Sequence, residues 1–258
     1  DGGDIDELMR RADAAMYEAK TTGRDMACFY SVATDQKALA RQTVEQHLRR
    51  ALERNEFSLH YQPRLAASGG QLLGVEALLR WTHPTLGQIP PGEFIPIAEE
   101  TGMIRAIGHW VLHQACAQWV QWQAPAHRAA LGDVCVSVNL SAAQLSDPQL
   151  VPDIAALLAR TGMPAHRLEL EITESQLMDN AHAAEQQLAA LKALGVLLSI
   201  DDFGTGYSSL AYLKRFDIDR LKVDKSFVHD MLTNPADLAI TRAIIALGHT
   251  LGLKIVAE

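Results

Sequence analysis

The sequence predicts an α/β fold built on parallel strands, and three observations lead to it. From Phe57 onward, short strand-like runs alternate with helical stretches over about 200 residues, as in parallel sheets with crossover helices. The strands have one apolar and one polar face, as in 135–140, where valine and leucine alternate with cysteine, serine and asparagine. Charged residues fall near the carboxyl ends of these strands, where barrel enzymes place their chemistry. An open doubly wound sheet also fits the alternation, but its strands normally read as continuous apolar runs, so the polar face favours a closed barrel.

The expected elements follow one another along the chain. Residues 4–20 have apolar residues at helical spacing, 28–30 could form a short strand, and 38–54 form an amphipathic, Arg-rich helix. The strand-like runs are 57–62, 72–81, 134–140, 167–173, 196–200, 220–223 and 254–257. The helical candidates between them are 108–123, 148–161, 181–194 and 236–251.

Composition narrows the class of protein. The 258 residues are 48% hydrophobic and 21% charged, with a formal net charge of −8, which is typical of a folded globular protein. No run approaches the roughly 18 apolar residues of a membrane span, and the acidic balance excludes a strongly basic surface for DNA or RNA. Cys28, Cys116 and Cys135 lie far apart, which indicates reduced thiols in the cytoplasm. The chain opens without Met and stops on an apolar run, so we expect it to be a piece of a longer polypeptide.

Six oxygen-bearing side chains lie at or near predicted strand ends and are candidates for a metal site. They are Glu76, Asn139, Glu171, Asp201, Asp202 and Glu258. Five carboxylates at one barrel mouth repel one another strongly, so such a cluster requires cations. Because every donor is an oxygen, the set favours Mg²⁺ or Mn²⁺ over zinc or copper. The adjacent Asp201 and Asp202 suit two ions with one bridging carboxylate, and Lys222 is placed to steady an attacking hydroxide.

Each of these residues also has a simpler interpretation. A single strand-end Glu is more often a helix cap or a surface ion pair, Asp201-Asp202 fits a turn, and Lys222 fits an exposed edge. The coincidence of six oxygen donors at five strand ends favours a shared site. Asp202-Phe203-Gly204 matches a kinase tripeptide, but no catalytic-loop motif precedes it. His60 and His83 are interpreted as structural.

Eight motifs, in order over about four fifths of the chain, carry a family resemblance. They are YQP at 61–63, VEALLRW at 75–81, FIP at 94–96, VNLS at 138–141, LEITES at 170–175, DDFGTGYSSL at 201–210, KVD at 222–224 and VAE at 256–258. With these motifs the chain resembles the EAL-domain cyclic di-GMP phosphodiesterases. The resemblance implies a modified (β/α)₈ barrel whose first strand runs antiparallel to the others. It implies hydrolysis of cyclic di-GMP to linear 5′-pGpG; a receptor that binds the nucleotide without hydrolysis is the alternative.

The resemblance also implies roles for individual residues. Glu76, Asn139, Glu171 and Asp201 would hold one Mg²⁺ or Mn²⁺, Asp201 would bridge to a second ion at Asp202, and Glu258 would complete the site. Lys222 would position the catalytic water with support from Asp224, and Gln62 and Arg80 would contact the guanine and phosphate of the substrate. Glu174 would anchor a loop that couples homodimer formation to activity. That loop comprises Asp202, Phe203, Gly204, Thr205, Gly206, Tyr207, Ser208 and Ser209.

Residues upstream of the barrel give a second resemblance. Residues 11–20 are similar to the C-terminal end of a GGDEF domain, which suggests a bacterial signalling protein with both domains in tandem. We therefore predict a GGDEF remnant at 1–32, a linker at 33–44 and an EAL domain at 45–258. Family members continue past Glu258 with an eighth strand, so we expect that strand to be missing from the barrel.

Overall fold

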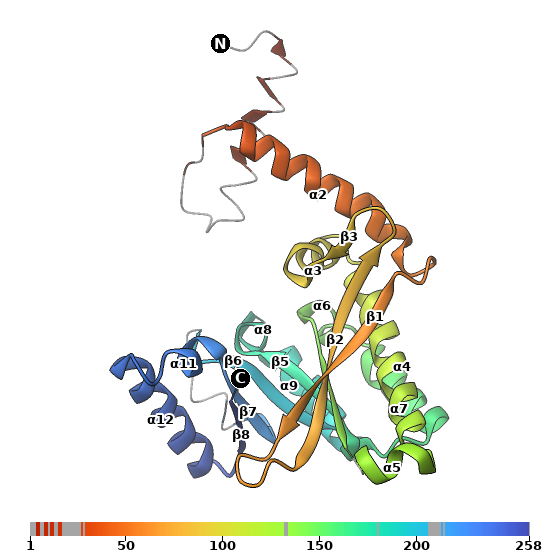
Figure 1. Ribbon diagram of the computed structural model, residues 1–258, viewed down its shortest axis with the longest axis vertical. Coiled ribbons are helices and arrows are strands. Elements are labelled where there is room, and N and C mark those ends of the chain that lie inside the picture. The colour runs from red at the N-terminus through yellow and green to blue at the C-terminus, as the bar shows by residue number, and fades with distance from the viewer. Residues whose placement is uncertain are drawn as a thin grey trace. The chain divides into compact units, whose positions relative to one another are not determined.

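A computed structural model provides the architecture (Figure 1). It describes residues 4–5, 8–9, 11–12, 15–16, 27, 29–131, 134–179, 181–205, 213 and 215–257. Most of the helix predicted at 4–20 lies outside these residues. Phe29 and Tyr30 do not belong to a strand, so the strand predicted at 28–30 is wrong for these two residues.

One curled sheet forms the centre of the fold (Figure 1). Its path runs β1-β2-β4-β5-β6-β7-β8, and neighbouring strands from β2 onward along this path are parallel. The strands are β1 (Phe57–Leu65), β2 (Leu72–His83), β4 (Cys135–Asn139), β5 (Leu168–Thr173), β6 (Leu197–Phe203), β7 (Arg220–Val223) and β8 (Lys254–Ala257). Chain order equals spatial order, as in a barrel and unlike a doubly wound sheet, in which the strand order reverses.

The first strand runs opposite to the others. β1 and β2 are joined by only six residues, and the amide of Ala66 donates to the carbonyl of Gln71 across the turn. So short a connection can join only antiparallel strands, because parallel neighbours need a crossover of about a dozen residues. The antiparallel first strand is therefore confirmed. The described residues supply seven strands along the path, with β1 and β8 at its two ends, in agreement with the predicted barrel that lacks its eighth strand.

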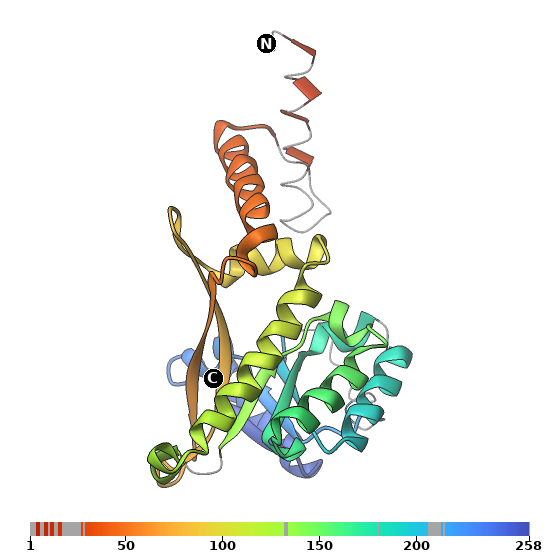
Figure 2. The same cartoon turned by 90° about the vertical axis from the view of Figure 1, so that its right-hand side faces the viewer.

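Helices follow the strands and cover the sheet (Figure 2). Of these, α4 packs against β4, α9 against β6, and α12 against β7 and β8. The helices of this part are α4 (Ile104–Trp122), α5 (Pro125–Leu131), α6 (Ala142–Leu145), α7 (Leu150–Thr161), α8 (Glu174–Asp179), α9 (Ala181–Ala193), α11 (Lys225–His229) and α12 (Pro235–Thr250), with a 3₁₀ turn at Ala165–Arg167. The four long predicted helices are present, whereas the short ones, α5, α6, α8 and α11, are too brief to show a helical period.

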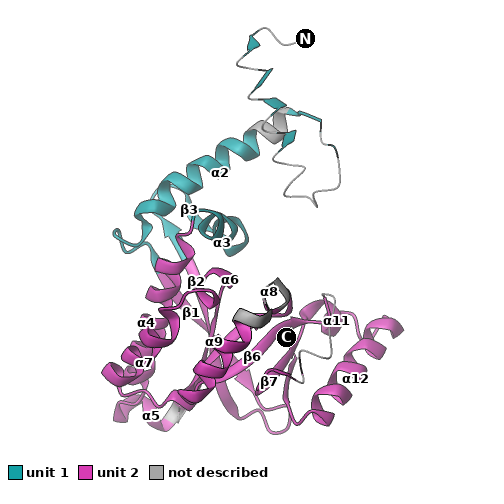
Figure 3. Ribbon diagram, turned by 180° about the vertical axis from the view of Figure 1, so that it is seen from behind, with its two compact units in different colours: residues 1–57, 81–101 teal, residues 58–80, 102–258 magenta. Residues whose placement is uncertain are grey.

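The chain divides into two compact units (Figure 3). The smaller comprises residues 1–57 and 81–101, and the larger comprises 58–80 and 102–258. In the smaller unit, α2 (Val32–Ala51) begins six residues before the predicted helix and contains the predicted linker 33–44. It packs against α3 (Pro91–Glu100), and β3 (Gly87–Ile89) pairs antiparallel with the end of β2. The rings of Phe57, Trp81 and Phe94 form its core, with centroids 5.5–5.9 Å apart.

Successive side chains along a strand alternate between two buried regions, one on each face of the sheet. In β5, Leu168, Leu170 and Ile172 are fully buried on one face, the face that packs helices. Glu169 and Glu171, on the other face, are also buried, at 0% and 1% exposure. The polar face therefore lies inside the curled sheet, not at its solvent-exposed rim. Within the part of the chain that the structure describes, no helix is both long and apolar enough to cross a bilayer.

Candidate active site

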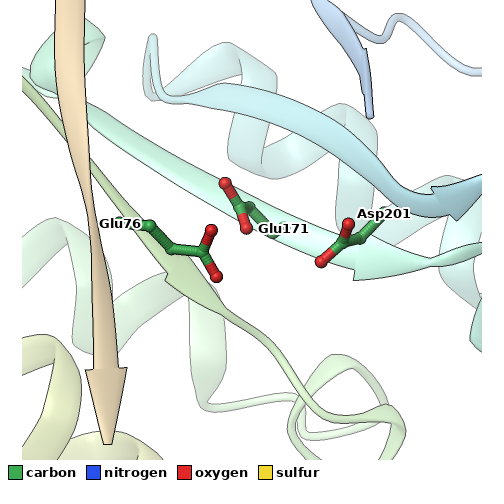
Figure 4. Close-up of side chains that lie close together, drawn as sticks. All are labelled: Glu76, Glu171 and Asp201. Atoms are coloured by element: carbon green, nitrogen blue, oxygen red, sulfur yellow. The ribbon is translucent and has the colours of Figure 1, made fainter. Parts of the chain in front are cut away.

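Three carboxylates from three strands meet inside the curled sheet (Figure 4). Glu76 lies on β2, Glu171 on β5 and Asp201 on β6, and one oxygen of each lies within 4.8 Å of the others. Strand register explains the convergence of the last two, since Glu171 of β5 pairs with Ser199 of β6, two residues before Asp201 and on the same strand face. Glu76 was expected near a strand end, but β2 continues seven residues beyond it to His83. We call these three residues the carboxylate cluster.

Lys222, from β7, places its ammonium within this cluster. Its Nζ donates to Glu171 Oε2 at 2.7 Å, Asp201 Oδ2 at 3.0 Å and Glu76 Oε2 at 3.2 Å. The side chain is 1% exposed, so the simpler interpretation of Lys222 as an exposed edge residue is wrong. Burial opposes its charge, but the three carboxylates outweigh burial and raise the pKa of Lys222 above its usual value.

Burial also changes the acidity of the cluster. It raises the pKa of Glu171 to about 7, while the charge of Lys222 limits the rise and that of Glu76 adds to it. Asn139, the last residue of β4, donates from Nδ2 to Glu76 Oε1 at 2.9 Å, so its amide carbonyl remains available to a ligand. The site thus offers three carboxylates around one buried ammonium, with the amide of Asn139 beside Glu76.

Asp202 is not a member of the carboxylate cluster, although its neighbour Asp201 is. It has a positive φ of 51°, which is rare for a residue other than glycine, and its amide donates to Asp201 Oδ1 at 2.9 Å. Its carboxyl group hydrogen-bonds to Asp224. Burial, the charge of Asp201 and this bond raise the pKa of Asp202. Asp224 itself caps α11 by accepting from the amide of Ser226 at 2.9 Å.

The remaining predicted site residues are distributed around the cluster. Glu174, at the start of α8, accepts from the amide of Gly204 at 3.2 Å, which ties α8 to the segment after β6. Gln62 is exposed on β1, and Arg80 is half-buried on β2 with Nη1 donating to the carbonyl of Leu79. Phe203 is buried and Thr205 is exposed. The other predicted members, Gly206, Tyr207, Ser208, Ser209 and Glu258, lie outside the described residues.

A second group of charges inside the sheet did not emerge from the sequence. Arg64 of β1, Glu169 of β5 and Arg220 of β7 form ion pairs, and Arg64 also reaches Glu171 at 3.3 Å. Each member lies two residues from a predicted site residue on the same strand: Arg64 from Gln62, Glu169 from Glu171, and Arg220 from Lys222. Because side chains two apart share a strand face, this spacing was the available signal.

Comparisons with known proteins agree with this geometry. A family model described as "EAL domain" matches residues 45–258. The chain is 48% identical over its whole length to the bifunctional diguanylate cyclase/cyclic di-GMP phosphodiesterase MucR of Pseudomonas aeruginosa, and 43% identical to the cyclic di-GMP phosphodiesterase NbdA of the same species. It spans 37% of MucR and 32% of NbdA, about a third of each.

Solved structures give the same family. A structure described as the PaMucR phosphodiesterase in complex with c-di-GMP superimposes with a TM-score of 0.79 at 48% identity, covering 84% of this chain and 86% of that one. The family model alone matches well over half of the chain. The chain therefore belongs to the EAL-domain family.

Proposed function

We propose that this protein is a phosphodiesterase that hydrolyses cyclic di-GMP to linear 5′-pGpG in bacterial signalling. Water adds to one phosphorus, the bond from that phosphorus to a ribose 3′-oxygen breaks, and the 3′-oxygen leaves as a hydroxyl. The observation that carries the proposal is the carboxylate cluster with Lys222 at its centre, in a chain of the EAL-domain family. Relatives named as cyclic di-GMP phosphodiesterases support the choice of substrate.

The residues present fit Mg²⁺ or Mn²⁺. Glu76, Glu171 and Asp201 offer convergent oxygens, the Asn139 carbonyl is a fourth, and no sulfur or imidazole is among them. We propose that these four hold one ion, that Asp201 and Asp202 hold a second, and that Glu258 completes the site. Bound there, such ions lower the pKa of a coordinated water and neutralise charge on the phosphate.

The chain's own side chains have further roles in this proposal. Lys222 hydrogen-bonds the attacking water and offsets negative charge as it develops on the phosphate. Asp224, the residue that follows β7, supports Lys222 in positioning this water. Gln62 and Arg80 bind the guanine and a phosphate of the substrate. All of these side chains lie on strands of the sheet or at their ends, so they need little ordering when substrate binds.

The end of β6, Asp202 and Phe203, and the segment that follows it are proposed to link oligomeric state to activity. Glu174 accepts from Gly204 and so joins the start of α8 to residues 202–205. We propose that residues 202–209 form the dimer-coupling loop, that the protein acts as a homodimer, and that Glu174 keeps the loop in its active form. The proposed location is the cytoplasm, where cysteines remain reduced.

The proposal is tested by turnover. The purified chain is incubated with cyclic di-GMP and MgCl₂ or MnCl₂, and pGpG is quantified by chromatography, with excess EDTA as the reference. Turnover with metal and none in EDTA is expected. Glu76→Gln should reduce turnover by more than about a hundredfold, because it removes a cluster carboxylate. Glu53→Gln, at an exposed position, is the matched control and should leave turnover unchanged.

The result also separates an enzyme from a receptor. A receptor would bind cyclic di-GMP tightly in EDTA and form no pGpG with either metal, and its Glu76→Gln variant would behave like the wild type. These results together would contradict the enzyme. Neither binding nor turnover would contradict both.

A further inference from the structure

A buried arginine links the carboxylate cluster to a second ion network inside the sheet. Arg64 Nη1 and Nη2 donate to Glu169 Oε1 and Oε2 at 3.0 and 2.7 Å, a two-pronged contact. The same Nη1 also lies 3.3 Å from Oε1 of Glu171. The side chain of Arg64 is 12% exposed, so these are contacts in a largely desolvated interior. Arg64 thus joins a carboxylate outside the cluster to one inside it.

Glu169 is held from several sides. Its carboxylate is fully buried and accepts from Arg220 Nη1 and, at 3.6 Å, from the thiol of Cys135, in addition to Arg64. A buried carboxylate between two guanidinium groups has its charge compensated and its rotamer fixed. Glu169 and Arg220 therefore form a rigid base against which the planar guanidinium of Arg64 is oriented.

Both oxygens of Glu171 receive donors, and the Ser137 side chain adds a further hydrogen bond to this carboxylate. Oε1 faces Arg64 at 3.3 Å and Oε2 faces Lys222 at 2.7 Å. A carboxylate with both oxygens engaged cannot rotate about its last torsion without breaking a charge-assisted bond. Its orientation toward Glu76 and Asp201 is thereby set before any cation arrives.

We propose that Arg64 is a positioning residue that fixes the Glu171 carboxylate for cation binding, with Glu169 and Arg220 holding Arg64 in place. The inference rests on the proposed function, because it takes Glu171 as a ligand of the catalytic ion. Ligating carboxylates are commonly oriented by hydrogen bonds from outside the ligand set, and loss of such a partner typically costs about 10–100-fold in metal affinity or activity. Arginine suits this place because its rigid fork can grip Glu169 with two bonds and still reach Glu171.

A simple charge effect predicts the opposite result. A guanidinium 3.3 Å from Glu171 repels a cation that approaches the same carboxylate. If charge alone mattered, removing it would strengthen cation binding, and Arg64→Lys would behave like the wild type. If positioning matters, Arg64→Met and Arg64→Lys both weaken binding, because lysine has no planar fork.

The test is Mn²⁺ binding, measured by isothermal titration calorimetry on the whole chain without nucleotide. The variants are Arg64→Met, Arg64→Lys, Glu169→Gln and the double variant Arg64→Met/Glu169→Gln. We expect a roughly tenfold or greater rise in Kd for both Arg64 variants. A smaller rise is expected for Glu169→Gln, and the double variant should be no worse than Arg64→Met, since both residues act through one contact. Arg49→Met, at an exposed ion pair with Glu45, is the control and should match the wild type.

Urea unfolding of the metal-free proteins separates positioning from general stability. Variants that lose stability but bind Mn²⁺ with the wild-type Kd overturn the inference, as does tighter binding by Arg64→Met or wild-type binding by Arg64→Lys. If Arg64→Met does not fold, Arg64→Lys and Glu169→Gln decide by the same criteria.

Turnover of cyclic di-GMP distinguishes this inference from the proposed function. A wild type that binds no Mn²⁺ and makes no pGpG overturns the function. If the wild type binds Mn²⁺ and makes pGpG, but the Arg64 variants bind Mn²⁺ equally well, the role of Arg64 is overturned and the proposed function stands. Reduced kcat with an unchanged KM in Arg64→Lys would support that role, because a residue that acts only by positioning Glu171 leaves substrate binding unchanged.

Discussion

Lys222 Nζ lies 2.7 Å from Oε2 of Glu171, and both side chains are almost completely buried. The pair joins β7 to β5 across β6, since each of these strands neighbours the next in the sheet. A buried ion pair of this kind is costly to break from one side, because the remaining charge stays desolvated.

Replacing Lys222 should destabilise the metal-free protein and increase its dependence on metal. Without the ammonium, the three cluster carboxylates repel one another, so Lys222→Met should lower the free energy of unfolding in EDTA by about 3–5 kcal/mol. Mn²⁺ should then raise the urea midpoint by more than it does in the wild type. Lys192→Met removes a lysine bound to Asp219 at 2.8 Å and is the control, with no change in the Mn²⁺ effect. Equal Mn²⁺ effects in the Lys222 variant and the wild type would contradict the prediction.

Gly74 should not tolerate a side chain. A Cβ at this position would lie 2.7 Å from the carbonyl oxygen of Cys135 and 3.0 Å from Nη2 of Arg64. Since β2 and β4 are paired there, the backbone cannot give way cheaply, and Gly74→Ala should cost about 1–3 kcal/mol. Gly92→Ala, in α3 with open space around its Cα, should be neutral or slightly stabilising. Urea unfolding of both variants checks the difference, and equal midpoints would refute it.

Tyr61 should make the protein sensitive to alkaline pH. Burial, and then the charge of Cys116, raise the pKa of Tyr61 to about 12, and its ring packs edge-on against Trp122. The unfolded chain loses this proton near pH 10 and the folded chain near pH 12, so the folded state binds more protons between these values. Stability must therefore fall as pH rises from about 10 to about 12.

The contribution of Tyr61 is isolated by Tyr61→Phe. The wild type should lose about 1 kcal/mol relative to this variant between pH 9 and pH 11, a figure reduced for the partial exposure of the ring. Urea unfolding at the two pH values measures it. Parallel pH profiles for the two proteins would show that Tyr61 ionises at its ordinary pKa.

The buried thiols should be inert in the folded protein. Burial raises the pKa of Cys116 to about 12 and that of Cys135 to about 11. Because the thiolate is the reactive form, iodoacetamide at pH 8 should modify both at least about a hundredfold more slowly in buffer than in 8 M urea. Mass spectrometry of a Cys28→Ser variant gives the two rates directly. Rapid labelling of either thiol in buffer would mean that the packing around that thiol opens readily.

The sequence alone was sufficient for the fold class and for selecting three carboxylates that converge inside the sheet. Strand alternation located every strand of the sheet path to within a few residues, because apolar and polar faces repeat every two positions. Glu171 and Asp201 were selected from their places near strand ends, whereas Glu76 lies in the middle of β2. Family motifs added the antiparallel direction of β1, which composition does not encode.

Only the tertiary structure decided which charges meet. Arg64 and Glu169 are 105 residues apart, and Glu169 and Arg220 are 51 apart, so no local pattern pairs them. Their contacts depend on how the sheet curls and on which strands face one another across it. The same curvature buries Lys222, which the sequence left open as an exposed edge residue. Periodicity determines the face on which a side chain lies, whereas its partners and its burial are fixed by the packing of distant strands.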